Sequence, residues 1–147
     1  MDRKTHWDSI HRTRSPDEVS WYEATPALSL RLVRRAIDAG ARSVIDIGGG
    51  ASRLVDHLVD LSLSRLVVLD VSSSAIEISR ARLGDAAERV EWIVGDVAEV
   101  RDLGTFDVWH DRAVFHFLTE RSEQDAYVAL CERTVDPSGV AIVATFA

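Results

Sequence analysis

Apolar residues in this chain follow two alternating patterns: short continuous runs and longer stretches with helical spacing. From 27 to 40 they recur at every third or fourth position, which predicts a helix that ends at Gly40. The run 43–47 is short and β-branched and predicts a strand. The alternation continues to the end of the chain. It predicts helices at 54–61, 72–83 and 124–135, strands at 65–70, 90–94, 106–109 and 140–143, and a turn at 137–139.

Strands that alternate with helices along a chain are typical of a parallel sheet with helices on both faces. We therefore predict an α/β fold with five strands, formed by residues 27–147. Residues 1–26 are more polar and carry only one short helical pattern, around 7–11. They predict an amino-terminal arm, or lid, in front of this domain.

Three consecutive glycines, Gly48, Gly49 and Gly50, follow the first predicted strand. Glycine lets the backbone turn sharply from strand to helix, and it lets a ligand approach with no Cβ in the way. The amides at the head of the next helix then face a ligand in the crevice. A flexible connection between strand and helix is the alternative, and the triplet alone does not decide between the two.

A carboxylate stands at the end of each of the first three predicted strands: Asp46, Asp70 and Asp96. Because parallel strands present their carboxyl ends at one edge of a sheet, we expect the three to converge on one crevice. Asp70 stands where dinucleotide folds place an acid on ribose hydroxyls, although a helix N-terminal charge is an alternative. Arg53 replaces the last glycine of G-x-G-x-x-G, which disfavours a pyrophosphate cofactor and a nicotinamide-dependent oxidoreductase.

The loop Asp46-x-Gly48-x-Gly50-x-Ser52 resembles the D-x-G-x-G-x-[GS] loop of class I S-adenosylmethionine-dependent methyltransferases. The resemblance extends from about Trp7 to the end of the chain and implies a Rossmann-like fold. It also implies S-adenosylmethionine as cofactor and S-adenosylhomocysteine as product, with an acid on the ribose and another at the adenine edge. The implied cofactor-binding residues are Asp46, Gly48, Gly49, Gly50, Ser52, Asp70, Val71, Asp96, Val97 and Trp21.

The segment 109–118, WHDRAVFHFL, is similar to the end of the fourth strand in bacterial methyltransferases. The resemblance implies that this loop lies beside the methyl group and that the arm folds over the cofactor. We expect Asp111 near the positive sulfonium and His110 as a group that could take a proton from the acceptor. Trp21 could cover the sulfonium by cation–π attraction, with ordinary packing as the alternative. No metal site is expected, because the histidine spacing is not a recognised ligand pattern.

One departure from the family pattern concerns the number of strands. The family fold has seven, whereas this chain ends after the fifth predicted strand. We therefore expect a truncated fold without the last hairpin, whose open edge could pair with a second copy of the chain. The alternative function is that of a non-catalytic module, which binds S-adenosylmethionine or S-adenosylhomocysteine or interacts with a partner.

Composition limits the classes of partner. A net charge of -7 disfavours nucleic acid, which proteins hold through basic side chains. The longest apolar run, 140–144, is far too short to span a membrane, and no signal segment opens the chain. The single cysteine, Cys131, excludes an internal disulfide. We expect a cytoplasmic enzyme that methylates an unidentified small-molecule or protein acceptor.

Overall fold

The computed structural model describes residues 2–13 and 26–145 of the 147-residue chain. Its helices are α1 (Arg3–Thr13), α2 (Ala27–Asp38), α3 (Leu54–Leu58), α4 (Ser73–Leu83) and α5 (Arg121–Thr134), with short 3-10 helices η2 (Gly84–Arg89) and η3 (Phe115–Phe117). Its strands are β1 (Ser43–Ile47), β2 (Arg65–Asp70), β3 (Glu91–Val94), β4 (Phe106–Arg112) and β5 (Val135–Ala144).

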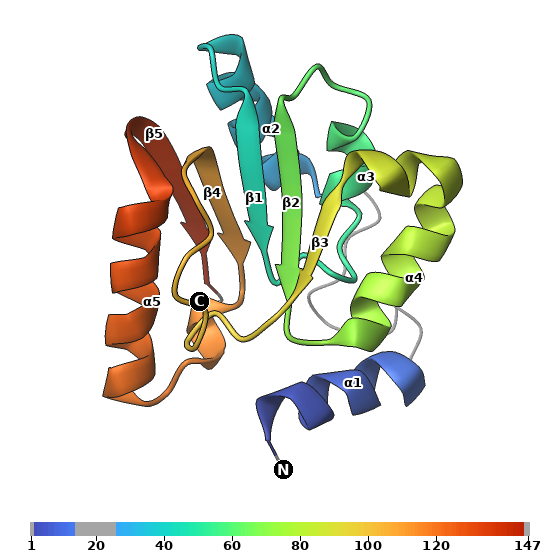
Figure 1. The fold of residues 1–147 in the computed structure, drawn as a ribbon, viewed down its shortest axis with the longest axis vertical. Coiled ribbons are helices and arrows are strands. Elements are labelled where there is room, and N and C mark those ends of the chain that lie inside the picture. Colours follow the sequence, from blue (N-terminus) through green and yellow to red (C-terminus); the bar gives the residue numbers. More distant parts are fainter. Residues whose placement is uncertain (1, 14–25, 146–147) are drawn as a thin grey trace.

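The five strands form one parallel sheet in the order β3-β2-β1-β4-β5, which confirms the predicted α/β fold. β1 lies in the middle, where Asp46 pairs with Val68 of β2 and with His110 of β4. All the strand arrows in Figure 1 point the same way. The carboxyl ends of the strands therefore meet at one edge, as the sequence predicts for Asp46, Asp70 and Asp96.

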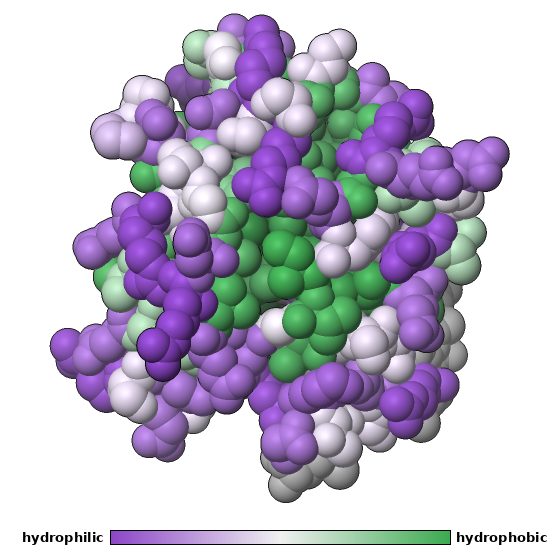
Figure 2. Space-filling view, viewed as in Figure 1, coloured by the Kyte–Doolittle hydropathy of each residue, from purple (hydrophilic) through white to green (hydrophobic). Residues whose placement is uncertain are grey.

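Helices cover both faces of the sheet and bury two apolar layers. On one face, Trp109 and Phe106 of β4 pack with Tyr127 and Leu130 of α5. On the other face, side chains of α2 and α3 pack against the alternate residues of the same strands. Figure 1 shows α5 beside β4 and β5, with α2 and α3 behind the sheet. In the same view, Figure 2 shows hydrophobic surface over the middle of the sheet, bordered by hydrophilic side chains.

The last two strands differ from the prediction. β4 continues to Arg112 rather than ending at Trp109, so His110 and Asp111 lie inside the strand. β5 begins at Val135, directly after α5, and the predicted turn at 137–139 is a bulge within it. The register shift between Phe106 and Val108 of β4 accommodates the extra residues.

α1 lies across the carboxyl edge of the sheet, below the strand ends in Figure 1. It is longer than the predicted short helix and begins at Arg3. None of the described helices is long and apolar enough to cross a membrane. The carboxyl edge and α1 together border a cavity.

Candidate functional site

The cavity lies between α1 and the carboxyl ends of β1 to β4. Apolar side chains make up much of its wall, and four charged side chains reach it: Arg3, Asp70, Asp96 and Arg112. A concave, mainly apolar site with a few convergent polar groups is the usual form of a small-molecule site. The complete lining is Arg3, Trp7, Ile47, Gly48, Leu69, Asp70, Val71, Gly95, Asp96, Val97, Arg112, Ala113, Val114, Phe117 and Leu118.

Each glycine after β1 occupies a place that a Cβ would obstruct. Gly48 has a φ of 69°, and a Cβ there would lie 2.0 Å from Cγ2 of Val114. A Cβ on Gly49 would lie 2.1 Å from Oδ2 of Asp46, and one on Gly50 would lie 2.7 Å from Oδ2 of Asp70. The glycine turn therefore packs directly on two of the carboxylates, and the flexible-connection alternative does not describe it.

Asp70 ends β2 and lines the cavity. Its Oδ2 accepts a hydrogen bond from the amide of Gly50 at 2.9 Å, and its Oδ1 accepts one from the amide of Ser72 at 2.8 Å. Burial raises the pKa of this carboxyl to about 6, and the two amide hydrogen bonds oppose that effect. The negative charges of Asp46 and Asp8 raise the pKa further. A hydroxyl or cationic partner would therefore stabilise the ionised form of Asp70.

Asp46 lies under the glycine turn and is buried. Its Oδ1 pairs with Nδ1 of His110 at 2.8 Å, and Nε2 of His110 lies 2.8 Å from Oγ of Ser29 in α2. Oδ2 of Asp46 has no hydrogen-bond partner among the described residues. Sequence reasoning did not find Ser29, because it lies 81 residues before His110 on a helix with no motif of its own.

Asp96 follows β3 and lines the cavity. Both of its oxygens accept hydrogen bonds from Nη1 of Arg3, at 2.7 and 2.5 Å, and Oδ1 also accepts one from the amide of Ala98. Nη2 of Arg3 donates to Glu123 of α5. Although burial alone would lower the pKa of Arg3, its hydrogen bonds to Glu123 and Asp96 raise it. α1 is thus fastened to the site by a guanidinium that sequence reasoning did not single out.

A second contact holds the middle of α1. Asp8 is buried and its Oδ1 accepts hydrogen bonds from Oγ of Ser72 at 2.6 Å and from the amide of Ser74 at 3.3 Å. Burial raises the pKa of Asp8, but hydrogen bonds from Lys4, Ser72 and Ser74 outweigh it and hold the pKa below its usual range. Ser72 also caps α4 by accepting from the amide of Ala75.

Asp111 and His110 do not line the cavity. Asp111 is 0% exposed and accepts hydrogen bonds from the amides of Val114 and Phe115 and from the hydroxyl of Tyr127, the last at 2.6 Å. Burial raises its pKa, which these three bonds oppose. The structure thus sets Asp111 as an anchor of the loop after β4. Contact of either residue with an acceptor stays a prediction.

The loop after β4 carries backbone strain beside the cavity. Ala113 has a φ of 78°, a left-handed conformation that costs a residue with a Cβ about 1 kcal/mol or more. The next residue, Val114, contacts the glycine turn, and Phe117 meets Trp7 of α1 with ring centroids 5.0 Å apart. The loop therefore connects the glycine turn to α1 around the cavity.

The other predicted cofactor residues fall into three groups. Val71 and Val97 line the cavity beside Asp70 and Asp96. Ser52 does not line it, and its Oγ accepts a hydrogen bond from the amide of Leu54 at the start of α3. Trp21 lies outside the described residues. Its place beside the cavity stays a prediction.

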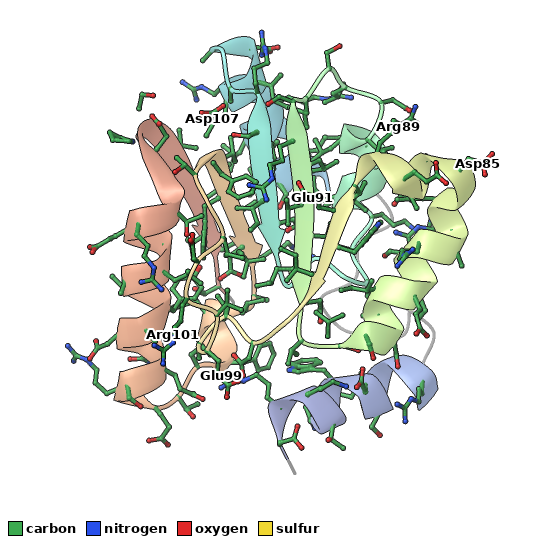
Figure 3. The ribbon with its side chains drawn as sticks, in the orientation of Figure 1. Asp85, Arg89, Glu91, Glu99, Arg101 and Asp107 are labelled. Carbon is green, nitrogen blue, oxygen red and sulfur yellow. The ribbon has the colours of Figure 1, made fainter. Side chains whose placement is uncertain are left out.

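Carboxylates at the opposite end of the sheet serve structure instead. Figure 3 shows Asp107 near the start of β4, far from α1. Its Oδ2 accepts hydrogen bonds from the amides of Arg42 and Ser43, at 2.7 and 3.2 Å, where β1 begins. Within residues 2–13 and 26–145, no three metal-binding side chains lie close enough together to hold a metal ion.

Comparison with known proteins identifies the family of this chain. The model of a methyltransferase domain matches residues 44–139, about two thirds of the sequence. No curated protein sequence matches the chain.

Solved structures give the same fold. An N-methyltransferase, NodS from Bradyrhizobium japonicum WM9, in complex with S-adenosylhomocysteine, superposes with a TM-score of 0.75 at 17% identity, over 97% of this chain and 72% of that one. The DhpI-SAM-HEP complex gives 0.69 at 19% identity, over 96% and 65%. Phosphoethanolamine N-methyltransferase 1 of Haemonchus contortus gives 0.70 at 19% identity, over 95% and 30%. The chain thus spans about two thirds of the DhpI chain and less than a third of the nematode enzyme.

Proposed function

The chain belongs to the methyltransferase-domain family, and from this premise we propose that it binds S-adenosylmethionine at the carboxyl edge of the sheet and transfers the methyl group to a small-molecule or protein acceptor. The observation that carries the proposal is the glycine turn packed on two buried carboxylates, Asp46 and Asp70. A nucleoside needs acceptors for its hydroxyls, and a methionine group needs a close approach to backbone. This edge offers both.

The residues at the cavity fit the nucleoside end of the cofactor. Asp70 offers two oxygens for the ribose hydroxyls beside Val71, and Asp96 offers an acceptor for an exocyclic amine beside the amide of Val97. Leu69 and Leu118 supply apolar surface for a flat ring. Arg3 shares the carboxylate of Asp96, so an amine at the adenine edge would join or replace one guanidinium hydrogen bond.

The methionine end fits the glycine turn. Gly48 lines the cavity without a Cβ, and Asp46 lies directly beneath Gly49 with one oxygen free of hydrogen bonds to the described residues. Gly50 and Ser52 hold the shape of the turn, the first by donating to Asp70 and the second by accepting from Leu54. We assign the cationic amino group of the cofactor to this end because buried negative charge lies there.

The cofactor, when bound, would supply an activated methyl group for transfer to a nucleophilic atom of the acceptor. The protein contributes mainly by holding the two partners in line. Trp7, Phe117 and Val114 line the cavity, and the negative charge of Asp111 lies behind the loop that carries Phe117 and Val114. His110 and Asp111 thus influence the methionine end of the site from positions outside the cavity lining.

Two further parts of the proposal concern partners and place. The outer edge of β5 is a sheet edge with Val140 and Val143 exposed by 41% and 45%, which favours pairing with a second copy of the chain. Light scattering after size-exclusion chromatography should then give twice the chain mass at high concentration.

The net charge of -7 favours an acceptor other than nucleic acid. We also propose a cytoplasmic location.

Calorimetric titration tests the proposal against the nicotinamide alternative. S-adenosylmethionine and S-adenosylhomocysteine should each bind with micromolar affinity, and NAD should not compete. Arg53 occupies the position of the last glycine of G-x-G-x-x-G, which dinucleotide-binding folds need for close packing of the helix on the strand. Tighter binding of NAD than of S-adenosylhomocysteine would contradict the proposed cofactor. Binding without methyl transfer to any acceptor would favour the non-catalytic alternative.

A further inference from the structure

Ser29, His110 and Asp46 form a continuous buried chain of hydrogen bonds from α2 through β4 to β1. Oγ of Ser29 lies 2.8 Å from Nε2 of His110, and Nδ1 of His110 lies 2.8 Å from Oδ1 of Asp46. All three residues are buried, and none of them lines the cavity. Ser29 and His110 therefore act only through Asp46, whose carboxylate lies against the glycine turn.

The same residue types form nucleophilic triads in hydrolases, where the hydroxyl faces the substrate. Here the order of contacts is the same, but Ser29 is buried on α2 behind the sheet edge. No acyl group in the cavity would meet its hydroxyl. The geometry is consistent with Ser29 and His110 holding the carboxylate of Asp46, and it does not allow nucleophilic attack by Ser29 on a ligand in the cavity.

The carboxylate of Asp46 is held at one oxygen and open at the other. Oδ1 accepts from His110, whereas Oδ2 is buried with no hydrogen-bond partner among residues 2–13 and 26–145. A buried polar atom without a partner is costly, and in native proteins it points to a bound group or to strain. Oδ2 lies directly under Gly49, next to Gly48 in the cavity wall. The open acceptor thus borders the end of the cavity assigned to the methionine group.

We propose that Ser29 and His110 are positioning residues that orient the Asp46 carboxylate so that Oδ2 receives the amino group of the cofactor, directly or through one water. The inference rests on the proposed function. An aspartate rotates broadly about its last side-chain bond, and the hydrogen bond from His110 holds it in one orientation. Ser29 in turn holds the imidazole ring, which leaves Nδ1 toward Asp46. His110 thereby serves the cofactor and not the acceptor.

Two ligands that differ at the methionine end test this role. S-adenosylhomocysteine carries the amino group, and 5′-methylthioadenosine has the same nucleoside and thioether without it. The Ser29→Ala variant should bind S-adenosylhomocysteine roughly threefold to tenfold more weakly, the loss expected for one hydrogen bond, and 5′-methylthioadenosine within about twofold of wild type. His110→Asn, whose amide can still donate to Asp46, should lose less of this selectivity than His110→Leu.

Thr134→Val is the matched control, because Thr134 is a second buried hydroxyl and lies at the end of α5, outside the cavity lining. It should leave both affinities unchanged. If Ser29→Ala weakens both ligands equally, or weakens neither, the positioning role is wrong while the proposed cofactor stands. If the wild-type chain binds neither ligand, the proposed function itself fails, and this inference fails with it.

Discussion

The guanidinium of Arg3 donates hydrogen bonds to both carboxylate oxygens of Asp96, at 2.7 and 2.5 Å, although 93 residues separate the two in sequence. The pair joins the first turn of α1 to the carboxyl end of β3, and a further bond to Glu123 reaches α5. Both partners are mostly shielded from solvent, with side-chain exposures of 23% and 16%. α1 is therefore part of the cavity wall and is held there by charge.

Replacing Arg3 with methionine should lower the free energy of unfolding by about 1–2 kcal/mol, because a shielded, charge-assisted pair is lost while the apolar stem is kept. The side chain of Asp96 would then lack its main partner. Chemical denaturation with urea measures the change. Arg89→Met is the control, since Arg89 pairs with Asp60 at 2.8 Å with both side chains exposed, and should cost about 0.5 kcal/mol or less. Equal losses in the two variants would contradict a special role for the Arg3 contact.

Asp70 should make cofactor binding sensitive to mild acid. Its carboxyl has a pKa of about 6, raised by burial above the ordinary value of 3.8. Ribose hydroxyls donate to the ionised form, so affinity for S-adenosylhomocysteine should be constant above about pH 7 and fall as the pH drops through 6. Each further decrease of one pH unit should then lower the affinity by up to about tenfold. Calorimetric titrations from pH 7.5 to 5 measure this profile.

The Asp70→Asn variant separates this titration from that of histidines elsewhere in the chain. An amide does not ionise, so the variant should bind weakly with no step near pH 6. A step of the same size in the variant would assign the pH dependence to another group.

Gly49→Ala should abolish cofactor binding while the chain stays folded. The new Cβ would lie 2.1 Å from Oδ2 and 2.4 Å from Cγ of Asp46, so the turn or the carboxylate must move. Gly84→Ala is the control, because Gly84 follows α4 and has nothing within 4 Å of its Cβ position, with only a φ of 60° to strain it. It should cost about 1 kcal/mol of stability and leave binding intact. Unchanged binding by Gly49→Ala would contradict the role of this turn.

Ala113→Gly should stabilise the chain by up to about 1 kcal/mol, because glycine adopts a φ of 78° without the Cβ clash. The melting temperature, measured by circular dichroism, reports the change. The same substitution at Ala129, in the exposed interior of α5, should destabilise by about 1 kcal/mol. A loss of stability at both positions would mean that the strain at Ala113 is offset by packing of its methyl group.

Local pattern was sufficient to predict the sheet. The strands 43–47 and 65–70 match β1 and β2 at both ends, because each is a buried β-branched run between polar segments. The three carboxylates at adjacent strand ends were also predictable, since parallel strands share one edge. The extension of β4 to Arg112 was not, because Trp109-His110-Asp111 mixes apolar and polar residues as a loop does.

The partners of the carboxylates could not be predicted from local sequence. Asp46 meets Ser29 through His110, and Asp96 meets Arg3, over separations of tens of residues that only the folded chain brings together. The apolar pattern of α1 is weak, so nothing local marked Arg3 or Asp8 as part of the site. The place of Asp111 at the reacting end stays a prediction from the resemblance, and its hydrogen bonds to Val114, Phe115 and Tyr127 of α5 could not be foreseen from local sequence.

The affinity of S-adenosylhomocysteine for the wild-type chain and for Asp70→Ala tests the assigned cofactor site most directly. We expect micromolar binding by the wild type and a loss of roughly 1.5–3 kcal/mol in the variant, the value of a hydrogen bond to a charged group. Circular dichroism should show that the variant keeps its fold. Equal affinities of the two folded proteins would contradict the placement of the ribose on Asp70, and with it the account of this edge as the cofactor site.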